Sequence, residues 1–333
     1  MLYLFLVYTI TILILSIFFK KKKNFSNYSG DKHQLATNEN NIPLTGGIFL
    51  IVPTILINPS NLILNFLLVS IFLIGFFSDR KILISPKLRF TLQLIIISLS
   101  VMLLNLEIMS SRIVFFDNFL KNSYFNLLFT IFCILILVNG SNFIDGLNSL
   151  LITYLVIVIY ILIKLNLVPD TIYFENNLNY FLIFLLILIF LNFSNLLMLG
   201  DAGAYLLSFF VGYLIIKSHN LNLDVSPYFF INLIWLPCFE NLFSIIRKLF
   251  SNLSPFTPDS NHLHQLVFRS VNKKFFRKKL IANNLSSIFI NSFNFIALYF
   301  VTIDPYNTIY QIKLTLIFIA CYFLIFFLLK NET

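Results

Sequence analysis

Long apolar runs, each bounded by a short polar stretch, repeat from one end of this chain to the other. Their lengths suit α-helices that cross a bilayer, for which roughly 17–25 residues are needed. The runs lack the alternation of period two that a membrane β-barrel requires. Because 59% of the residues are hydrophobic and only 11% are charged, the chain cannot cover a water-exposed globular surface. The sequence therefore predicts an all-α, polytopic membrane protein.

We expect about ten or eleven transmembrane helices, the second and third being a helical pair if they do not fully cross. Residues 1–333 are predicted to form one integral membrane domain with a His-containing loop at about 247–282. The first run is expected to remain as a membrane helix, because it lacks a basic start and a small-residue cleavage site. The predicted spans lie at about 2–19, 45–59, 61–77, 90–106, 125–138, 147–164, 179–192, 203–217, 227–246, 283–303 and 311–329.

Positive charge divides the predicted loops into two sets. Of the 23 Lys and Arg residues, 18 lie in the segments 20–45, 78–89, 139–146, 193–202, 247–282 and 330–333, which would share one side of the membrane. The positive-inside rule puts this set in the cytoplasm and the N-terminus outside. Because basic runs are also attracted to anionic lipid headgroups, the net charge of +9 does not indicate nucleic acid. The other side holds only Arg112, Lys121, Lys164, Lys217 and Lys313.

Small and ionisable residues gather at the helix ends on this same predicted side. Three carboxylates, Asp79, Asp145 and Asp201, lie there together with seven of the nine glycines. The opposite loops are short and carry no comparable cluster. Because ionisable residues near the membrane are costly, they are functional by default. The asymmetry predicts a site on the cytoplasmic face.

The stretch VNGSNFIDGLNSL (138–150) follows the apolar run LLFTIFCILIL. Asn139, Asn142 and Asp145 would share about 120° of one helix. Amides suit hydrogen bonds to a nucleobase or sugar, and a carboxylate suits Mg²⁺, a ribose hydroxyl or proton transfer. Gly146 would let a ligand or another backbone approach closely. An ordinary helix cap would use the same residue types.

Two further carboxylates have similar double interpretations. Asp201, flanked by Gly200 and Gly203, would lie near a helix N-terminus, where backbone N–H groups can hold a phosphate. The same Asp could also be a simple N-cap. Asp79 precedes several cations, among them Arg89, that could hold a lipid phosphate or only mark the cytoplasmic side.

Histidines occur in two polar loops of the predicted cytoplasmic side. His262 and His264 are two residues apart, so on a helix they would point in different directions, which disfavours a two-His zinc site. They suit hydrogen bonds to phosphate, although a solvated loop is the simpler interpretation. The loop 31–50 adds Lys32, His33 and the pair Gly46-Gly47. Alone, this loop indicates no more than a polar connector.

Taken in order, these motifs resemble the polyprenyl-phosphate N-acetylhexosamine-1-phosphate transferases, glycosyltransferase family 4. The matching patterns are GG, G-x-x-x-D…SP…R…Q, N-x-x-N-x-x-D-G-x-x-x-L, G-D-x-G and P-D-x-x-H-x-H, from about Lys32 to Leu266. The superfamily includes the undecaprenyl-phosphate GlcNAc-1-phosphate transferase and the phospho-MurNAc-pentapeptide translocase. The resemblance implies that a UDP-activated amino sugar gives its sugar-1-phosphate to undecaprenyl phosphate at the inner leaflet. UMP would leave, and Mg²⁺ or Mn²⁺ would be the cofactor.

The resemblance also implies roles for single residues. Asp201 matches the metal-binding Asp, and Asp79 matches the second of two paired acidic residues. The stretch 145–148 matches a nucleoside-binding segment, Asn192 matches an Asn of the diphosphate region, and the His pair matches a loop motif. The predicted catalytic residues are Asp79, Asp145, Asp201, His262 and His264, with Asp201 and Asp145 as metal ligands. The predicted substrate-binding residues are Lys32, His33, Gly46, Gly47, Arg89, Asn139, Asn142, Gly146, Leu147, Asn148, Asn192 and Gly200.

Two positions depart from the family pattern: Ser78 replaces the first Asp of the acidic pair, and Gln265 replaces a histidine. Three explanations are possible: Asp79 does the work of the pair, the lipid phosphate arrives already ionised, or the chain is inactive. The second is chemically reasonable, because the second pKa of a phosphate is about 6. The departures argue against the peptidoglycan translocase and for a transferase that starts a surface polysaccharide of the O-antigen or lipopolysaccharide type.

A transporter and a non-catalytic relative are the alternatives. Transporters bind near the midplane between matching halves, and neither feature is visible in the sequence. The sugar (GlcNAc, GalNAc, QuiNAc or FucNAc), the polymer and the oligomeric state, including a homodimer, stay open.

Overall fold

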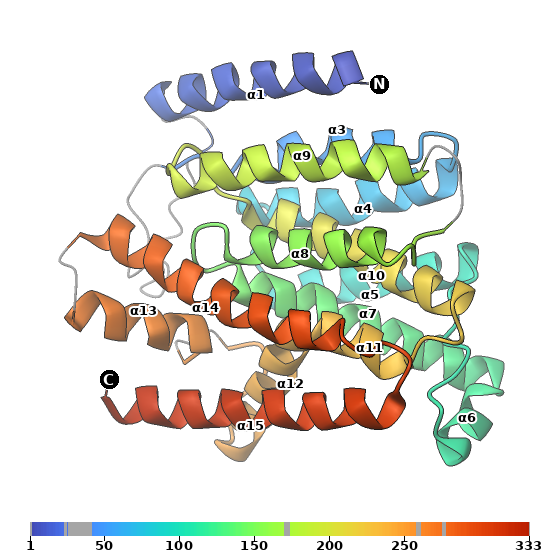
Figure 1. Ribbon diagram of the computed structural model, residues 1–333. Helices are drawn as coiled ribbons and strands as arrows, with labels where there is room; N and C mark the ends of the chain where they lie inside the picture. Colours follow the sequence, from blue (N-terminus) through green and yellow to red (C-terminus); the bar gives the residue numbers. More distant parts are fainter. Residues whose placement is uncertain are drawn as a thin grey trace.

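The computed structural model of the chain is a bundle of helices (Figure 1). It describes residues 2–22, 25, 42–169, 174–257, 261–274 and 278–332. In these ranges the only β-structure is one isolated bridge between Leu44 and Met198, so the all-α prediction is confirmed. The helices are α1 (Leu2–Lys22), α3 (Gly46–Ile57), α4 (Leu62–Asp79), α5 (Pro86–Leu103), α6 (Val114–Leu120), α7 (Ser123–Ile144), α8 (Leu150–Lys164), α9 (Phe174–Phe193), α10 (Gly200–Leu221), α11 (Pro227–Leu233), α12 (Trp235–Phe250), α13 (Leu263–Lys274), α14 (Lys279–Val301) and α15 (Thr308–Glu332).

Each predicted span coincides with a helix or, at 227–246, with the pair α11 and α12. By length and composition, six helices in the described part of the chain can cross a membrane: α4, α5, α7, α10, α14 and α15. The bent pair brings the number to seven, and α3, α8 and Asn177–Phe193 are shorter apolar helices. Short helices are accommodated by thinning of the bilayer or by neighbouring helices. The polytopic character is confirmed, whereas α6 and α13 are additional helices that the sequence did not predict.

The pair α11 and α12 is bent by 77°, and Pro237 provides the cause. A proline inside a helix removes one N–H donor and its ring collides with the carbonyl four residues earlier. That carbonyl belongs to Leu233, and it accepts a hydrogen bond from the Tyr154 hydroxyl at 2.8 Å. The backbone group released by the bend is therefore satisfied inside the protein, as a membrane requires.

Helix α10 forms the centre of the bundle, packed by α3, α4, α7 and α8 (Figure 1). Of its most apolar window, 83% is buried, against 22% for α5 and for α15. The exposed faces of the outer helices carry apolar side chains such as Ile317 and Leu324, which suit contact with lipid. The central place of α10 brings its first residues against the ends of α3 and α4.

Close helix contacts depend on glycine at two positions. A Cβ at Gly47 of α3 would lie 2.5 Å from the backbone nitrogen of Gly203 in α10. A Cβ at Gly140 of α7 would collide with the carbonyl oxygen of Pro237 in α12. Within a bilayer the hydrophobic effect does not drive helices together, so small residues that let the helix backbones pack closely stabilise their association. The Asn241 side chain also ties α12 to α7, donating to the Ile136 carbonyl at 2.9 Å.

We expect Gly140→Ala to lower the free energy of unfolding by about 1–3 kcal/mol, because the new methyl group meets backbone rather than a movable side chain. The control is Gly212→Ala in α10, where a Cβ would meet the end of the Leu137 side chain at 3.2 Å, which can shift. Thermal unfolding of both variants in detergent tests this. Equal melting temperatures for the two variants would contradict the close α7–α12 contact.

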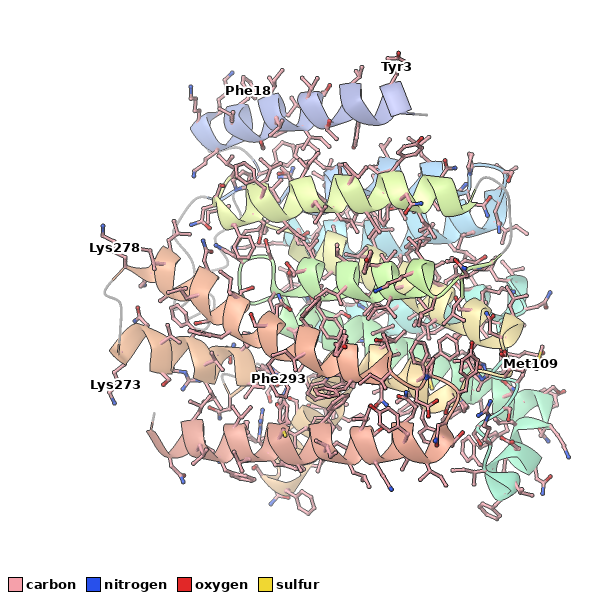
Figure 2. All side chains as sticks on the ribbon, viewed as in Figure 1. Tyr3, Phe18, Met109, Lys273, Lys278 and Phe293 are labelled. Carbon is pink, nitrogen blue, oxygen red and sulfur yellow. The ribbon has the colours of Figure 1, made fainter. Side chains whose placement is uncertain are left out.

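The loops separate into two ends of the bundle. At one end, the Arg112 guanidinium donates to the carbonyls of Tyr306 at 2.9 Å and Asp224 at 2.6 Å. Figure 2 shows Met109 at this end, and Lys273 and Lys278 at the opposite end. Residues 78–89 and 199–202 meet at that opposite end through the contacts described below. Segments predicted to share one membrane face thus share one end, while the side that this end faces stays a prediction.

Candidate active site

The N-terminus of α10 is capped by a carboxylate from another helix. Asp79, the last residue of α4, accepts the N–H of Asp201 at 2.9 Å and the N–H of Ala202 at 3.0 Å, one on each oxygen. The preceding residue, Gly200, has φ of 73°, and a Cβ there would lie 2.6 Å from Asp79 Oδ2. A negative charge at this position stabilises the partial positive charge of the helix end. Asp79 therefore holds the first turn of α10 in place.

Asp201, in that first turn, belongs to a three-residue network. Ser78 Oγ donates to Asp201 Oδ2 at 2.6 Å, and Arg89 Nη1 donates to the same oxygen at 2.9 Å. Arg89 Nη1 also lies 2.7 Å from Ser78 Oγ. The side chains of Arg89 and Asp201 keep 25% and 24% of their surface exposed, so a ligand can reach both. Within the described ranges Asp201 Oδ1 has no hydrogen bond, which leaves it available.

Asp145 comes directly after α7 and faces the same region. Its backbone N–H closes the helix on the Ser141 carbonyl at 3.2 Å. No hydrogen bond or ion pair to its carboxyl is found in the part of the chain described. Burial raises the pKa of the Asp145 carboxyl well above its usual value, and the negative charges of Asp201 and Asp79 raise it further. A cation bound among these groups would favour the ionised carboxylate.

The two histidines pack on the end of α7 beside Asp145. Their rings are nearly parallel, at 10°, with centroids 5.8 Å apart, and the His262 ring lies 5.0 Å from that of Phe143. A Cβ at Gly146 would collide with His264 Nε2, so glycine admits the ring. Because His262 lies before the first turn of α13, the two histidines do not share a helix, and the divergence expected of helical residues two apart does not apply.

Asn148 and Asn192, both predicted to bind substrate, are buried in a network of amides. The side-chain amide of Asn148 donates to Asn195 and to Asn284 at 2.8 Å each, and its backbone N–H donates to Asn283 at 2.7 Å. Asn192 accepts the N–H and the hydroxyl of Ser149 and donates to the Leu197 carbonyl. The network joins the turn after α7 to the turn after α9 and to α14. Substrate contact by these two residues stays a prediction.

Several other predicted residues have structural partners. The N–H groups of Gly46 and Gly47 donate to the carbonyls of Met198 at 2.9 Å and Leu199 at 3.0 Å, which seats the segment before Gly200. Asn139 donates to the Leu135 carbonyl of its own helix at 3.0 Å. Leu147 is buried in the apolar core, whereas Asn142 is half-buried. Lys32 and His33 lie outside the described residues.

Two contributions to this region were not predicted from the sequence. One is the hydrogen-bonding role of Ser78, which appeared only as a departure from the family pattern. The other is Glu240, a buried carboxylate 2.8 Å from His262 Nδ1. A lone carboxylate inside the run WLPCFENLF is an intramembrane ionisable residue, and that signal could have identified it.

The donor set suits a magnesium-type ion completed by substrate. In the described part of the chain, no group of three or more His, Cys, Asp or Glu side chains could hold a metal ion by itself. Mg²⁺ usually needs only one or two protein carboxylates, with phosphate oxygens and water as the other ligands. Asp201 Oδ1 and the Asp145 carboxyl are oxygens without hydrogen bonds in the described ranges, as such a site requires.

Comparison with known proteins matches this region of the chain. Residues 61–219 fit the model of glycosyl transferase family 4. Over 73 residues, the chain is 33% identical to the undecaprenyl-phosphate alpha-N-acetylglucosaminyl 1-phosphate transferase of Salmonella typhi and 30% identical to that of Escherichia coli K12. The aligned stretch covers 22% of this chain and 20% of each relative, so about a fifth of their length is matched. The resemblance inferred from the motifs is confirmed over 61–219, a range that includes all three aspartates but neither His262 nor His264.

Proposed function

We propose that this chain, whose residues 61–219 fit the model of glycosyl transferase family 4, transfers an amino-sugar 1-phosphate from a UDP-sugar to undecaprenyl phosphate, releasing UMP. One observation carries the proposal: Asp79, Arg89, Asp145 and Asp201, from four separate elements, converge at one end of a membrane bundle. Carboxylates for a divalent ion beside a guanidinium for phosphate are what phosphoryl transfer from a nucleotide requires.

Charge neutralisation and positioning are the main tasks of such a site. Asp201 Oδ1 and Asp145 would hold Mg²⁺ or Mn²⁺, which neutralises diphosphate charge when bound. Arg89, already oriented by Ser78 and Asp201, offers its remaining N–H groups to a phosphate oxygen. An in-line displacement then forms a bond from the lipid phosphate oxygen to the β-phosphorus and breaks the bond from the β-phosphorus to the bridging oxygen, which leaves with UMP.

The hydrogen bonds of Asp79 argue against a role as general base, so the attacking lipid phosphate would have to be ionised already. Both oxygens of this carboxylate accept N–H groups of α10, so protonation would weaken the cap that holds Asp201. A phosphate monoester has its second pKa at about 6 and is largely dianionic at neutral pH. We therefore assign Asp79 to holding the metal-binding turn, and we assign no general base to the lipid phosphate.

The remaining predicted residues would surround the nucleotide and sugar. Asn139, Asn142 and Gly146 lie on or next to the last turns of α7, beside Asp145, and suit the uridine. His262 and His264, stacked over the same end, suit the diphosphate or the sugar. The site would face the cytoplasm at the inner membrane, and the product would start a surface polysaccharide of the O-antigen or lipopolysaccharide type.

Ser78 is one of the two departures from the family pattern that support a non-catalytic relative. We expect Ser78→Ala to slow turnover by only about 3–10-fold, the value of one hydrogen bond, because the direct Arg89–Asp201 contact at 2.9 Å remains. The measurement is the rate of UMP release at saturating donor. A loss greater than about 100-fold would make the Ser78 hydroxyl itself essential and would contradict the supporting role.

The experiment that tests the proposed reaction is UMP release by the purified chain in detergent, with undecaprenyl phosphate, Mg²⁺ and a panel of UDP-amino sugars. Release that depends on lipid, on one donor and on the divalent ion supports the proposal and identifies the sugar. No UMP with any donor, while an authentic transferase works in the same mixture, would overturn it in favour of the non-catalytic alternative.

A further inference from the structure

Behind the histidine loop lies a buried carboxylate with three hydrogen-bond donors. Glu240, on α12, is 1% exposed. Its Oε1 lies 2.8 Å from His262 Nδ1 and accepts the N–H of Leu263 at 3.3 Å, and its Oε2 accepts the Tyr322 hydroxyl at 2.6 Å. Because the Leu263 N–H donates to one oxygen and the Tyr322 hydroxyl donates to the other, the carboxylate acts as an acceptor on both oxygens, as its ionised form does.

This arrangement fixes the orientation of the His262 ring. A carboxylate that only accepts requires a proton on Nδ1, which leaves Nε2 on the far side of the ring from Glu240. In the described ranges His262 Nε2 has no hydrogen-bond partner. The ring packs on Phe143, two residues before Asp145, which puts the imidazole beside the candidate site.

Glu240 is itself rigidly held, which a positioning role requires. Its helix is pressed against α7 at Gly140 and fastened there by the Asn241 hydrogen bond to the Ile136 carbonyl at 2.9 Å. Tyr322 comes from α15 and is enclosed by Phe239 and Phe243, with ring centroids at 4.9 and 5.6 Å. The carboxylate is therefore fixed relative to α7, the helix that carries Asp145.

Stability alone explains this carboxylate poorly. A charge within a membrane helix is expensive, and well-packed apolar residues in place of a buried ion pair are often neutral or stabilising. A buried carboxylate that orients a histidine is, by contrast, a common means of fixing the tautomer and direction of a functional imidazole. The position of Glu240 fits the second use.

We propose that Glu240 is a positioning residue: it holds the His262 imidazole by Nδ1 and directs Nε2 to a phosphate oxygen of the nucleotide-sugar donor. The identity of that ligand rests on the proposed function, whereas the Glu240–His262 arrangement does not. When the ring is protonated, Nε2 is a second donor and suits a phosphate oxygen. Tyr322 completes the set by holding the opposite oxygen of Glu240.

A double-mutant cycle on UMP release tests whether Glu240 acts through His262. Glu240→Ala is expected to lower kcat/KM for the donor by about 10–100-fold, as loss of an orienting partner does. Glu240→Gln keeps an acceptor for Nδ1–H and should recover at least part of that loss. The variant Glu240→Ala/His262→Ala should be no slower than His262→Ala alone. Fully additive losses, or a Glu240→Ala variant as fast as the unaltered chain, would overturn the proposal.

A second measurement does not depend on turnover. The chain has four His residues, so ¹⁵N-histidine NMR of the full-length protein gives few signals, and His262→Ala assigns one of them. We expect a protonated Nδ1 for His262, retained in Glu240→Gln and altered in Glu240→Ala. Glu240→Gln carries the test if Glu240→Ala fails to fold. An unprotonated Nδ1 in the unaltered chain would overturn the arrangement even with transferase activity present, and a protonated Nδ1 would support it even if no donor is turned over.

Discussion

Asp201→Asn is expected to reduce turnover by about 10²–10³-fold or more, the loss typical when a transition-state charge loses its main stabilising group. The substitution removes the negative charge that pairs with Arg89 at 2.9 Å and replaces one carboxylate oxygen by an NH₂ group, so no anionic oxygen is left for the divalent ion. It retains the size of the side chain and leaves the N–H groups that Asp79 accepts. The folded structure should therefore persist while the dependence of the rate on Mg²⁺ weakens.

The matched control for Asp201→Asn is Asp117→Asn. Asp117 lies at the opposite end of the bundle, where it accepts the Ser111 N–H at 2.6 Å and the Ser110 hydroxyl at 3.0 Å. UMP release at several Mg²⁺ concentrations compares the two variants. Equal activity for them would show that the site is not at the N-terminus of α10.

The second large effect is expected for Gly200→Ala, which acts on the same turn through the backbone. With φ of 73°, Gly200 lies in the left-handed region, where an alanine costs roughly 1–2 kcal/mol. The added Cβ would also come within 2.6 Å of Asp79 Oδ2 and displace the carboxylate that caps α10. We expect a loss of stability above about 2 kcal/mol and, in the protein that still folds, a shift of Asp201 that abolishes most activity.

Gly212→Ala, on the same helix and away from the site, is the control for this prediction. Melting temperature and UMP release of the two variants in detergent separate the structural effect from the catalytic one. A Gly200→Ala variant with unaltered melting temperature and rate would mean that the turn before α10 differs from the one described.

The sequence predicted most of the helices because apolar length is a local property. Charge asymmetry then predicted that Asp79, Asp145 and Asp201 share one end, since loops on one side of a membrane must meet there. The break before α12 was not predicted, because Pro237 lies inside a run that is long and apolar enough to be predicted as one span. Its effect depends on Tyr154 of a distant helix, whose hydroxyl donates to the carbonyl of Leu233 that the bend releases.

The roles of individual side chains depended on contacts that no sequence pattern records. Asp79 and Asp201 are 122 residues apart, and only the packing of α4 on α10 reveals that one caps the helix of the other. Glu240 and Tyr322 meet across 82 residues for the same reason. Asn148 and Asn192 were predicted to bind substrate from the family resemblance, but their burial in an amide network could not be read from spacing.

The most direct measurement of the central claim follows the β-phosphorus of the donor. Purified chain in detergent is given undecaprenyl phosphate, Mg²⁺ and the active UDP-sugar labelled with ³²P at the β-position, and the lipid is extracted. Transfer of a sugar 1-phosphate predicts that the label moves into the lipid fraction together with the sugar, in amounts equal to the UMP released. A lipid fraction that gains sugar without label, with the label left on UDP, would contradict the reaction proposed here.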